Sequence, residues 1–297
     1  MFLSNKKICL VAKNTEISRK LIAELLKQNN SIVFIEDDYK IDSKMIVDKQ
    51  NRITTINLKD ISVLEYIAKC DVVISLLFLP YVESFNKINY KVKFTQKMFD
   101  FFEKNELLQN LIISLPVLTN TKTSYIYKKL STVKNNLKTK VKNFCILETS
   151  IVLTKDNLYY NLQLLNKFTS QYPVNITDTK DLLKAILFLT DSLNFHTYSA
   201  KTVQVGSLNF IKTEDIKPFL IDLQNFNTKN NIDNFFITNS INKIKNYVKF
   251  YYYSKLFYIL NNQANHNITL QDFNISTTSI KETLSICYND YETSWHN

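Results

Sequence analysis

The turn between an apolar run and an amphipathic stretch near the N-terminus could hold a phosphate group. Residues 7–38, KICLVAKNTEISRKLIAELLKQNNSIVFIEDD, contain an apolar run, a polar turn, a helix-like stretch, a second apolar run and an acidic cluster. A dinucleotide-binding strand–helix–strand unit has this order, and its helix N-terminus presents free amides and a positive dipole end to a pyrophosphate. The three positions where such a unit needs glycine are instead Ala12, Thr15 and Ser18.

Small side chains in this turn could partly replace the missing glycines. They preserve some access to the backbone but lack glycine's freedom at positive φ, a loss of roughly 1 kcal/mol or more. Asn14, Thr15 and Ser18 could add amide or hydroxyl donors. The chain of 297 residues has a single glycine, Gly206, as expected for AT-rich coding DNA, so its absence here is weak evidence of lost function. A remodelled dinucleotide site and an empty crevice kept as scaffold both remain open.

An acidic cluster follows the second apolar run, at Glu36, Asp37 and Asp38. A carboxylate at this point can accept a hydrogen bond from the ribose 2′-OH of NAD, whereas the 2′-phosphate of NADP prefers arginine. If a dinucleotide binds, this cluster favours NAD(H) over NADP(H). A solvated acidic turn is the alternative interpretation.

Composition indicates a folded globular protein without a metal or disulfide framework. The chain is 45% hydrophobic and 22% charged, with a formal net charge of +10, and is long enough for one sizeable core beside a smaller lobe. Its three histidines give a zinc or histidine-dependent centre little to build on. The four cysteines form no C-x-x-C pair, and we expect buried free thiols at Cys9, Cys70, Cys145 and Cys287.

The sequence contains no predicted membrane span. Its longest apolar run, which begins at Val72, is shorter than the roughly 18 to 20 residues that cross a bilayer and is typical of a buried strand. The N-terminus lacks the pattern of a signal peptide, because an apolar strand follows almost at once.

Six apolar runs alternate with amphipathic segments in the first half of the chain. Nearly unbroken apolar strands are typical of a parallel sheet that is covered on both faces. Strands that alternate with helices predict a Rossmann-like, doubly wound α/β fold. The predicted strands are 7–12, 31–36, 53–58, 71–78, 110–116 and 143–148, and the predicted helices are 17–29, 61–70, 90–105 and 124–140.

The alternation loosens after about residue 150. Residues 181–193 predict a helix, 202–208 a short strand, and 241–260 a helix with one apolar and one lysine-rich face. We expect a nucleotide-binding domain over 1–165 and a smaller, mostly helical lobe over 166–297, with part of 170–210 returning to the sheet domain.

Taken in order, these segments resemble the extended and atypical members of the short-chain dehydrogenase/reductase superfamily. Ser114, Tyr125 and Lys129 then match the serine that orients a carbonyl, the general-acid tyrosine and the lysine that lowers the tyrosine's pKa. The matching segments are 12–18 for G-x-x-G-x-x-G, 56–60 for G-D-L-x-D, 70–77 for the fourth strand, 111–117 for the strand ending in serine, and Tyr125 with Lys129 for Y-x-x-x-K.

Two features count against catalysis. Leu115 and Pro116 directly follow Ser114, where the superfamily has small polar residues. The Y-x-x-x-K spacing also needs no catalysis to explain it, since it simply places Tyr125 and Lys129 on one helix face. The three residues are therefore vestigial candidates, with Lys129 more plausible as a ribose ligand.

The resemblance also implies where a cofactor would lie. The pyrophosphate would lie over 14–17, the adenine ribose near Asp37 or Asp38, and the adenine between Asn57 and Leu58. The full set of implied cofactor contacts is Ala12, Asn14, Thr15, Glu16, Ile17, Ser18, Asp37, Asp38, Asn57, Leu58, Leu76, Tyr125 and Lys129.

A narrower resemblance covers most of the rest of the chain. Residues 148–161 are similar to R-P-S-x-x-F-G-x-E-D-R-F-x-N, 172–178 to P-V-x-V-x-D, and 269–291 to L-x-D-L-G-I-x-P-T-x-x-E-x-x-L-x-x-Y-L. These segments characterise the reductase-like, nucleotide-binding accessory subunit of respiratory complex I and its bacterial relatives. That subunit is associated with NADPH, so the acidic cluster is a departure.

This narrower resemblance implies a non-catalytic subunit that stabilises assembly, with NAD(H), NADP(H) or no cofactor. It would lie on the matrix side of the mitochondrial inner membrane or the cytoplasmic face of a bacterial inner membrane. The basic helix 241–260 could meet other subunits or anionic lipid, or be a solvated face. The alternatives are a free NAD(P)-dependent reductase or epimerase and, less favoured, a basic RNA-binding relative.

Overall fold

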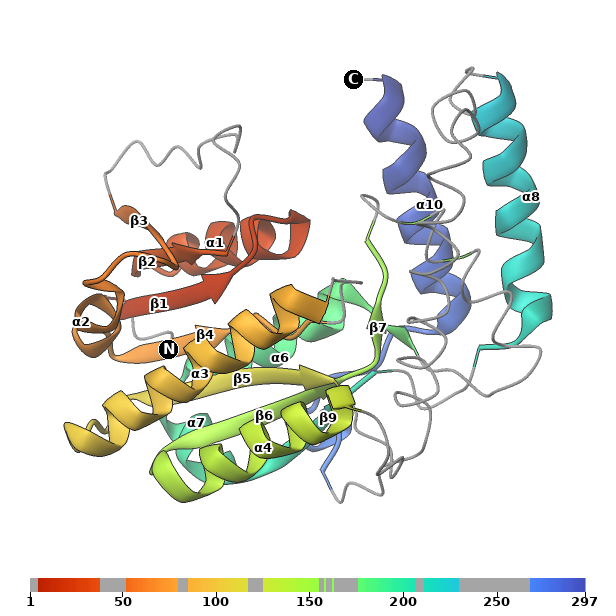
Figure 1. The fold of residues 1–297 in the computed structure, drawn as a ribbon. Coiled ribbons are helices and arrows are strands. Elements are labelled where there is room, and N and C mark those ends of the chain that lie inside the picture. Colours follow the sequence, from red (N-terminus) through yellow and green to blue (C-terminus); the bar gives the residue numbers. More distant parts are fainter. Residues whose placement is uncertain are drawn as a thin grey trace.

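The sheet has the strand order expected of a doubly wound α/β protein (Figure 1). All six predicted strands lie in one parallel sheet with the order β3-β2-β1-β4-β5-β6-β9, so the predicted fold class is confirmed. The structure is a computed structural model and describes residues 5–37, 52–79, 85–116, 125–154, 158, 162, 176–206, 211–229 and 268–296.

The winding of the chain reverses at β1, which pairs with β2 on one side and with β4 on the other. In such sheets ligands bind in the crevice outside the carboxyl ends of the strands, next to the point of reversal. The predicted placement of residues 12–18 at this edge is confirmed. The strands are β1 (Lys7–Ala12), β2 (Ser31–Glu36), β3 (Ile53–Asn57), β4 (Val72–Ser75), β5 (Asn110–Pro116), β6 (Phe144–Thr149) and β9 (Thr202–Val205).

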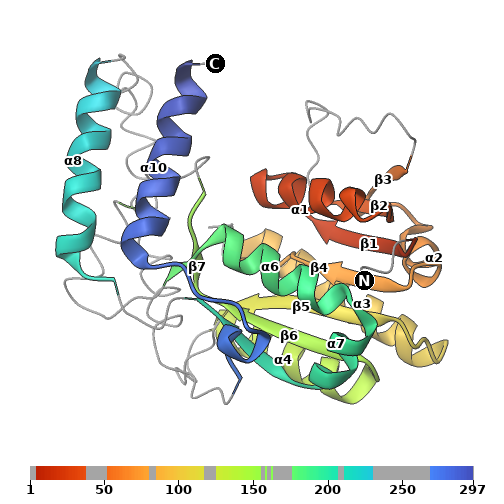
Figure 2. The same cartoon turned by 180° about the vertical axis from the view of Figure 1, so that it is seen from behind.

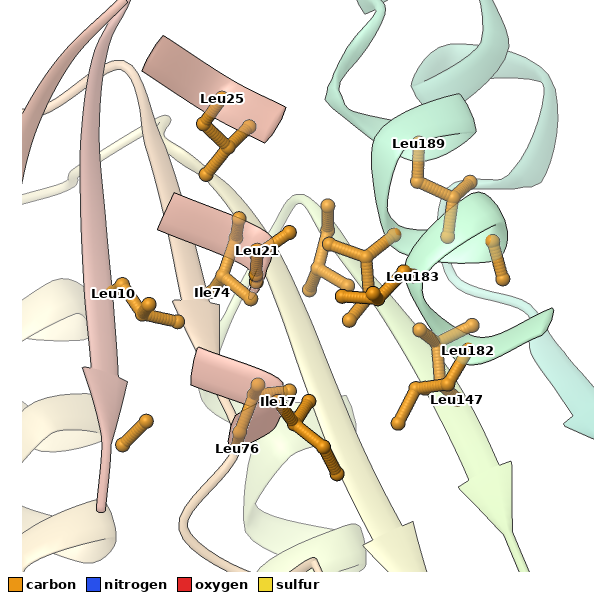
Figure 3. Close-up of a cluster of buried hydrophobic side chains, with 14 of the residues drawn as sticks. Leu10, Ile17, Leu21, Leu25, Ile74, Leu76, Leu147, Leu182, Leu183 and Leu189 are labelled. Carbon is orange, nitrogen blue, oxygen red and sulfur yellow. The ribbon is translucent and has the colours of Figure 1, made fainter. Parts of the chain in front are cut away.

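Two sets of helices cover the two faces of the sheet (Figures 1 and 2). Because side chains alternate along a strand, Leu10 packs beneath one set and Cys9 beneath the other. Figure 3 shows side chains of α1, α6 and the sheet meeting in one apolar cluster. The first face carries α1 (Glu16–Lys27), α6 (Thr179–Thr190) and α7 (Ser192–Tyr198), and the second carries α2 (Val63–Ala68), α3 (Phe85–Lys104) and α4 (Tyr125–Lys140).

The single helix predicted over 181–193 is instead two helices. Asp191 has extended backbone angles, and its carboxylate accepts hydrogen bonds from the N–H groups of Leu193 and Asn194. It therefore caps α7 and ends α6, although apolar residues continue at helical spacing past it.

The end of the chain returns to the sheet domain. Ile268 accepts a hydrogen bond at its carbonyl oxygen from the Gln204 N–H, so residues next to the short helix η3 (Leu270–Phe273) border edge strand β9. Phe273 stacks on Phe188 of α6 and meets the ring of Tyr198 edge-on. This segment covers an edge that would otherwise present unpaired backbone groups.

The smaller lobe stands at the carboxyl edge of the sheet (Figures 1 and 2). Among the described residues it consists of the two-stranded sheet β7 (Ile151–Val152) and β8 (Ile176–Thr177), with α8 (Thr213–Lys229) and α10 (Ile280–His296). These elements share their own apolar cluster. The predicted helix 241–260 lies outside the described residues.

The described ranges contain neither a candidate membrane span nor a candidate metal cluster. No helix there is long and apolar enough to cross a bilayer, and no three histidine, cysteine, aspartate or glutamate side chains gather as metal ligands. All four cysteines are buried free thiols.

Gly206 lies where three segments of backbone converge. A Cβ there would lie 3.2 Å from Thr177 Oγ1 and 3.3 Å from the carbonyl oxygen of Ile176. The Thr177 hydroxyl donates to the carbonyl oxygen of Val205, at 2.7 Å, and accepts from the N–H of Ser150, at 3.0 Å. Gly206 has no left-handed φ, so what glycine provides at this site is a close approach of the three segments without a tight Cβ contact.

Replacing Gly206 with alanine should lower the free energy of unfolding by about 1–3 kcal/mol, because the new methyl group forces apart backbone that Thr177 holds together. Urea denaturation would measure this. Ala200 has φ +60°, where glycine is less strained, so Ala200→Gly should raise the same free energy by about 1 kcal/mol. Equal stabilities for wild type and Gly206→Ala would contradict the packing argument.

Asp181 ties the C-terminal segment to α6. It is 1% exposed, and its carboxylate accepts hydrogen bonds from the N–H of Thr278, at 2.7 Å, and from the Thr278 hydroxyl, at 2.8 Å. Burial raises the pKa of Asp181 above its ordinary value of 3.8, and the charge of Asp178 adds to this, while the Thr278 hydrogen bonds lower it. The folded state therefore holds a proton more tightly than the unfolded chain.

As pH rises above this ordinary value, the folded state binds more protons than the unfolded state, so the slope of stability with pH is negative. We expect wild type to lose free energy of unfolding relative to Asp181→Asn between about pH 4 and pH 7. Urea titrations of both proteins across this range would measure the difference. A difference that grows in the other direction would show that the Thr278 hydrogen bonds outweigh burial.

Candidate functional site

The turn after β1 is closed from inside by a serine hydroxyl. Ser18 is buried, and its Oγ accepts a hydrogen bond from the Thr15 N–H at 2.8 Å. The same oxygen lies 2.8 Å from the Lys13 carbonyl oxygen and 2.9 Å from that of Thr15, and it can donate to either. A side chain at a motif glycine position has therefore taken up the Thr15 amide, which is not available to a phosphate.

The N-terminus of α1 already has a negative partner. Glu16 is the first residue of this helix, is 7% exposed, and lies with Oε1 2.6 Å from Lys20 Nζ. A carboxylate is stabilised there by the helix dipole, as a phosphate would be. Lys20 Nζ also lies 3.6 Å from Asp290 Oδ2, which links the helix to α10 of the smaller lobe. Burial would lower the pKa of Lys20, but these two carboxylates outweigh it and the pKa is raised.

Charged groups of both signs surround the Cys287 thiol between α1 and α10. Burial raises the pKa of the Cys287 thiol to about 12, and the charges of Asp178, Glu16 and Asp290 act in the same direction. Lys20 opposes them. A pyrophosphate brought to this end of the sheet would therefore meet the Glu16 and Asp290 carboxylates together with the Lys20 ammonium.

Asp37, the predicted ribose ligand, is paired within the protein. Its N–H donates to the Ala12 carbonyl oxygen, and its Oδ2 lies 3.0 Å from Lys91 Nζ of α3. The two side chains are 9% and 3% exposed, and Lys91 Nζ also donates to the carbonyl oxygen of Leu77 at 2.9 Å. Asp38 lies outside the described residues.

The predicted adenine contacts are divided between surface and core. Asn57 is exposed at the end of β3, where its Oδ1 accepts from the Lys59 N–H. Leu58 is buried in the cluster on the α2–α4 face. Leu76 and Ile17 are core residues on the opposite face and lie side by side in Figure 3, so neither is exposed in a crevice.

The structure does not gather the three catalytic candidates on one face. Ser114 is fully buried, and its Oγ lies 3.3 Å from Thr149 Oγ1. By alternation Ser114 faces the same side as Ile112, beneath α1 and α6. Tyr125 and Lys129 belong to α4, which covers the other side, where Lys129 is half-buried. The side chain of Tyr125 lies outside the described residues.

Sequence reasoning missed two buried ion pairs near the carboxyl edge. Besides Lys91 with Asp37, Glu148 of β6 is 2% exposed with Oε1 2.5 Å from Lys134 Nζ of α4. A signal existed for Lys91, which falls three residues after Ile88 and four before Thr95 on the buried face of α3. A lysine in that phase of an amphipathic helix must find a buried partner.

The described residues do not fit a dinucleotide in the pose that the sequence predicts. A pyrophosphate over residues 14–17 would lie beside the buried Glu16 carboxylate, and a ribose at Asp37 would compete with the Lys91 ammonium. The turn supplies no glycine to bring its backbone closer. No reaction step through a cofactor follows from this geometry.

Comparison with known proteins establishes the fold. No protein-family model and no curated protein matches the sequence. The Bordetella bronchiseptica enzyme WbmH in complex with NAD⁺ is 12% identical with a TM-score of 0.62, covering 97% of this chain and 98% of that chain. The epimerase Mth375 from Methanothermobacter thermautotrophicus is 10% identical at 0.59, covering 99% and 94%. Vestitone reductase from alfalfa is 9% identical at 0.59, covering 98% and 100%. The chain therefore shares, over nearly its whole length, the fold of an epimerase and a reductase.

Restoring glycine at Ser18 should destabilise the protein, because the Thr15 N–H would lose its buried acceptor. Loss of the serine hydroxyl leaves that amide unpaired, and we expect Ser18→Gly to lower the free energy of unfolding by about 1–3 kcal/mol. Ser18→Ala should lose a similar amount, which separates the hydroxyl from glycine's backbone freedom. Urea denaturation would measure both. A stabilised Ser18→Gly would mean that the turn is strained and that the serine only tolerates it.

Proposed function

We propose that the protein is a non-catalytic, reductase-like accessory subunit of respiratory complex I. The observation that carries the loss of catalysis is the position of Ser114, fully buried beside Thr149 on the face opposite α4. A carbonyl reductase needs this serine and the general-acid tyrosine within hydrogen-bond reach of one oxygen atom. A serine buried on that face supports a structural role.

The identity of the assembly rests on the resemblance of 148–161, 172–178 and 269–291. The geometry of the third segment supports it, since Asn274 has φ +56° at the position where the motif L-x-D-L-G-I carries glycine. Asparagine adopts this left-handed conformation more readily than most residues. The backbone that the motif specifies is therefore kept in this chain after its glycine is gone.

We infer that the chain is an atypical member of the short-chain dehydrogenase/reductase superfamily placed at a membrane surface. In this proposal the lysines of 241–260 meet anionic lipid or an acidic subunit. Each lysine near a charged membrane would contribute on the order of 1 kcal/mol. Subunit contacts, and a position on the matrix or bacterial cytoplasmic side, are part of the same proposal.

A free NAD-dependent epimerase or reductase is the second candidate. The full-length match in fold to an epimerase, a reductase and an enzyme solved in complex with NAD⁺ favours it. In this proposal Lys91 would have to leave Asp37 when cofactor arrives, and a different residue would have to replace Ser114.

Charge reversal in the basic segment tests the assembly. Lys243→Glu, Lys245→Glu and Lys249→Glu together should release the protein from the respiratory complex on native gels, because attraction to an anionic surface becomes repulsion. The matched control reverses Lys93, Lys97 and Lys104, three exposed lysines of α3, and should assemble normally. Assembly of the first variant at wild-type levels would reduce this segment to a solvated face.

Turnover separates the two candidates. The purified protein with NADH or NADPH should not reduce a carbonyl substrate, and Tyr125→Phe should change nothing. Carbonyl reduction that disappears in Tyr125→Phe would establish the enzyme and overturn the accessory role.

A further inference from the structure

We propose that Lys91 is an internal replacement for the adenosine half of a dinucleotide, filling the part of the crevice where the adenine ribose would bind. This goes beyond the assembly role and does not depend on it. An adenosine group can then enter only when the Lys91 ammonium leaves Asp37 and the Leu77 carbonyl oxygen. The missing glycines do not decide this.

The Lys91 ammonium lies between the carboxyl ends of two strands. Asp37 follows the end of β2, and Leu77 lies two residues beyond the end of β4. Lys91 Nζ contacts both, at 3.0 Å from Asp37 Oδ2 and 2.9 Å from the Leu77 carbonyl oxygen. Because β2 and β4 flank β1, a group that bridges their carboxyl ends lies across the end of β1. This is the crevice in which a doubly wound sheet binds its ligand.

The Lys91 side chain is almost completely buried. A lysine that is 3% exposed is stable only while its charge is matched, because the desolvation of an ammonium far exceeds that of a neutral group. Asp37 supplies the matching charge and Leu77 a second acceptor. A surface lysine that swings into solvent has no such requirement. Lys91 is therefore held in the crevice as a fixed part of the fold.

Lys91 and a ribose hydroxyl would compete for the Asp37 carboxylate. A ribose hydroxyl would have to displace the charged ammonium from this carboxylate. As a neutral donor, the hydroxyl makes a weaker hydrogen bond than the ammonium does. The displaced ammonium would also lose the Leu77 carbonyl oxygen. Burial and the negative charge of Asp37 both raise the pKa of the neighbouring Tyr90 phenol.

Adenosine is the probe that tests this half of the site alone, because it carries no phosphate and avoids Glu16. Calorimetric titration should find no saturable binding to wild type, and binding at least about tenfold tighter to Lys91→Ala. Lys93→Ala, an exposed lysine on the same helix, is the matched control and should behave as wild type. If Lys91→Ala does not fold because Asp37 is left unpaired, Asp37→Asn with Lys91→Ala removes both charges. This double variant should bind adenosine more tightly than wild type but more weakly than a folded Lys91→Ala, because an amide oxygen is a weaker acceptor than a carboxylate.

Three results would overturn the proposal. Wild type could bind adenosine as tightly as Lys91→Ala, or a folded Lys91 variant could fail to bind it at all. The third result uses 2′-AMP, whose phosphate could attract Lys91 out of the sheet. Binding of 2′-AMP to wild type that is lost in Lys91→Ala would make Lys91 a ligand of a 2′-phosphate instead.

Discussion

The hydroxyl of Thr177 holds the junction on which the arrangement of the two parts depends. By joining the Val205 carbonyl oxygen to the Ser150 N–H, it fixes the end of β9 against β8, with Gly206 pressed against both. Helix α6 begins two residues later, capped by Asp178, and presents Asp181 to Thr278 in the strap that leads into α10. Helix α10 in turn places Asp290 near Lys20 of α1. The smaller lobe is thus joined to the carboxyl edge of the sheet by a series of contacts that begins at Thr177.

At this edge of the sheet, the protein's own charged side chains lie where the sequence predicts groups of a dinucleotide. A helix N-terminus and an acidic strand end are two features that the doubly wound fold creates wherever its strands end. Glu16 occupies the first, and Lys91 neutralises the second. A buried ion pair is weak evidence for stability, since well-packed apolar residues often do as well, but removing one partner is strongly destabilising. Such pairs therefore persist once formed, and a chain that has them depends less on a bound ligand to hold β2, β4 and α3 together.

The sequence predicted the sheet because its strands are apolar throughout, and burial on both faces leaves no other stable pairing for them. It could not predict the break at Asp191, where a local cap competes with continuing helical periodicity. Nor could it predict which face of the sheet Ser114 lies on, because all the neighbouring residues of this strand are apolar on both faces. The sequence also could not predict the ion-pair partner of Lys91. That lysine is visibly on the buried face of α3, but Asp37 is 54 positions earlier, and only the packing of α3 on the sheet brings them together.

The use of glycine and asparagine separates two demands on the backbone. Among the described residues, asparagine adopts a positive φ at Asn5, Asn29 and Asn274, and two other residue types do so at Glu106 and Ala200. Asparagine carries a Cβ and therefore cannot relieve a close contact. Gly206 lies where a Cβ would be tightly packed against Thr177, Ile176 and Ser150. The turn after β1 would impose the same demand if a pyrophosphate approached its backbone, since the motif's second glycine exists to permit that approach. Thr15 stands there instead, and at the third position Ser18 uses its side chain to close the turn. The single glycine of the chain thus serves a close contact within the protein, whereas in the turn after β1 a side chain makes the contacts that close the backbone.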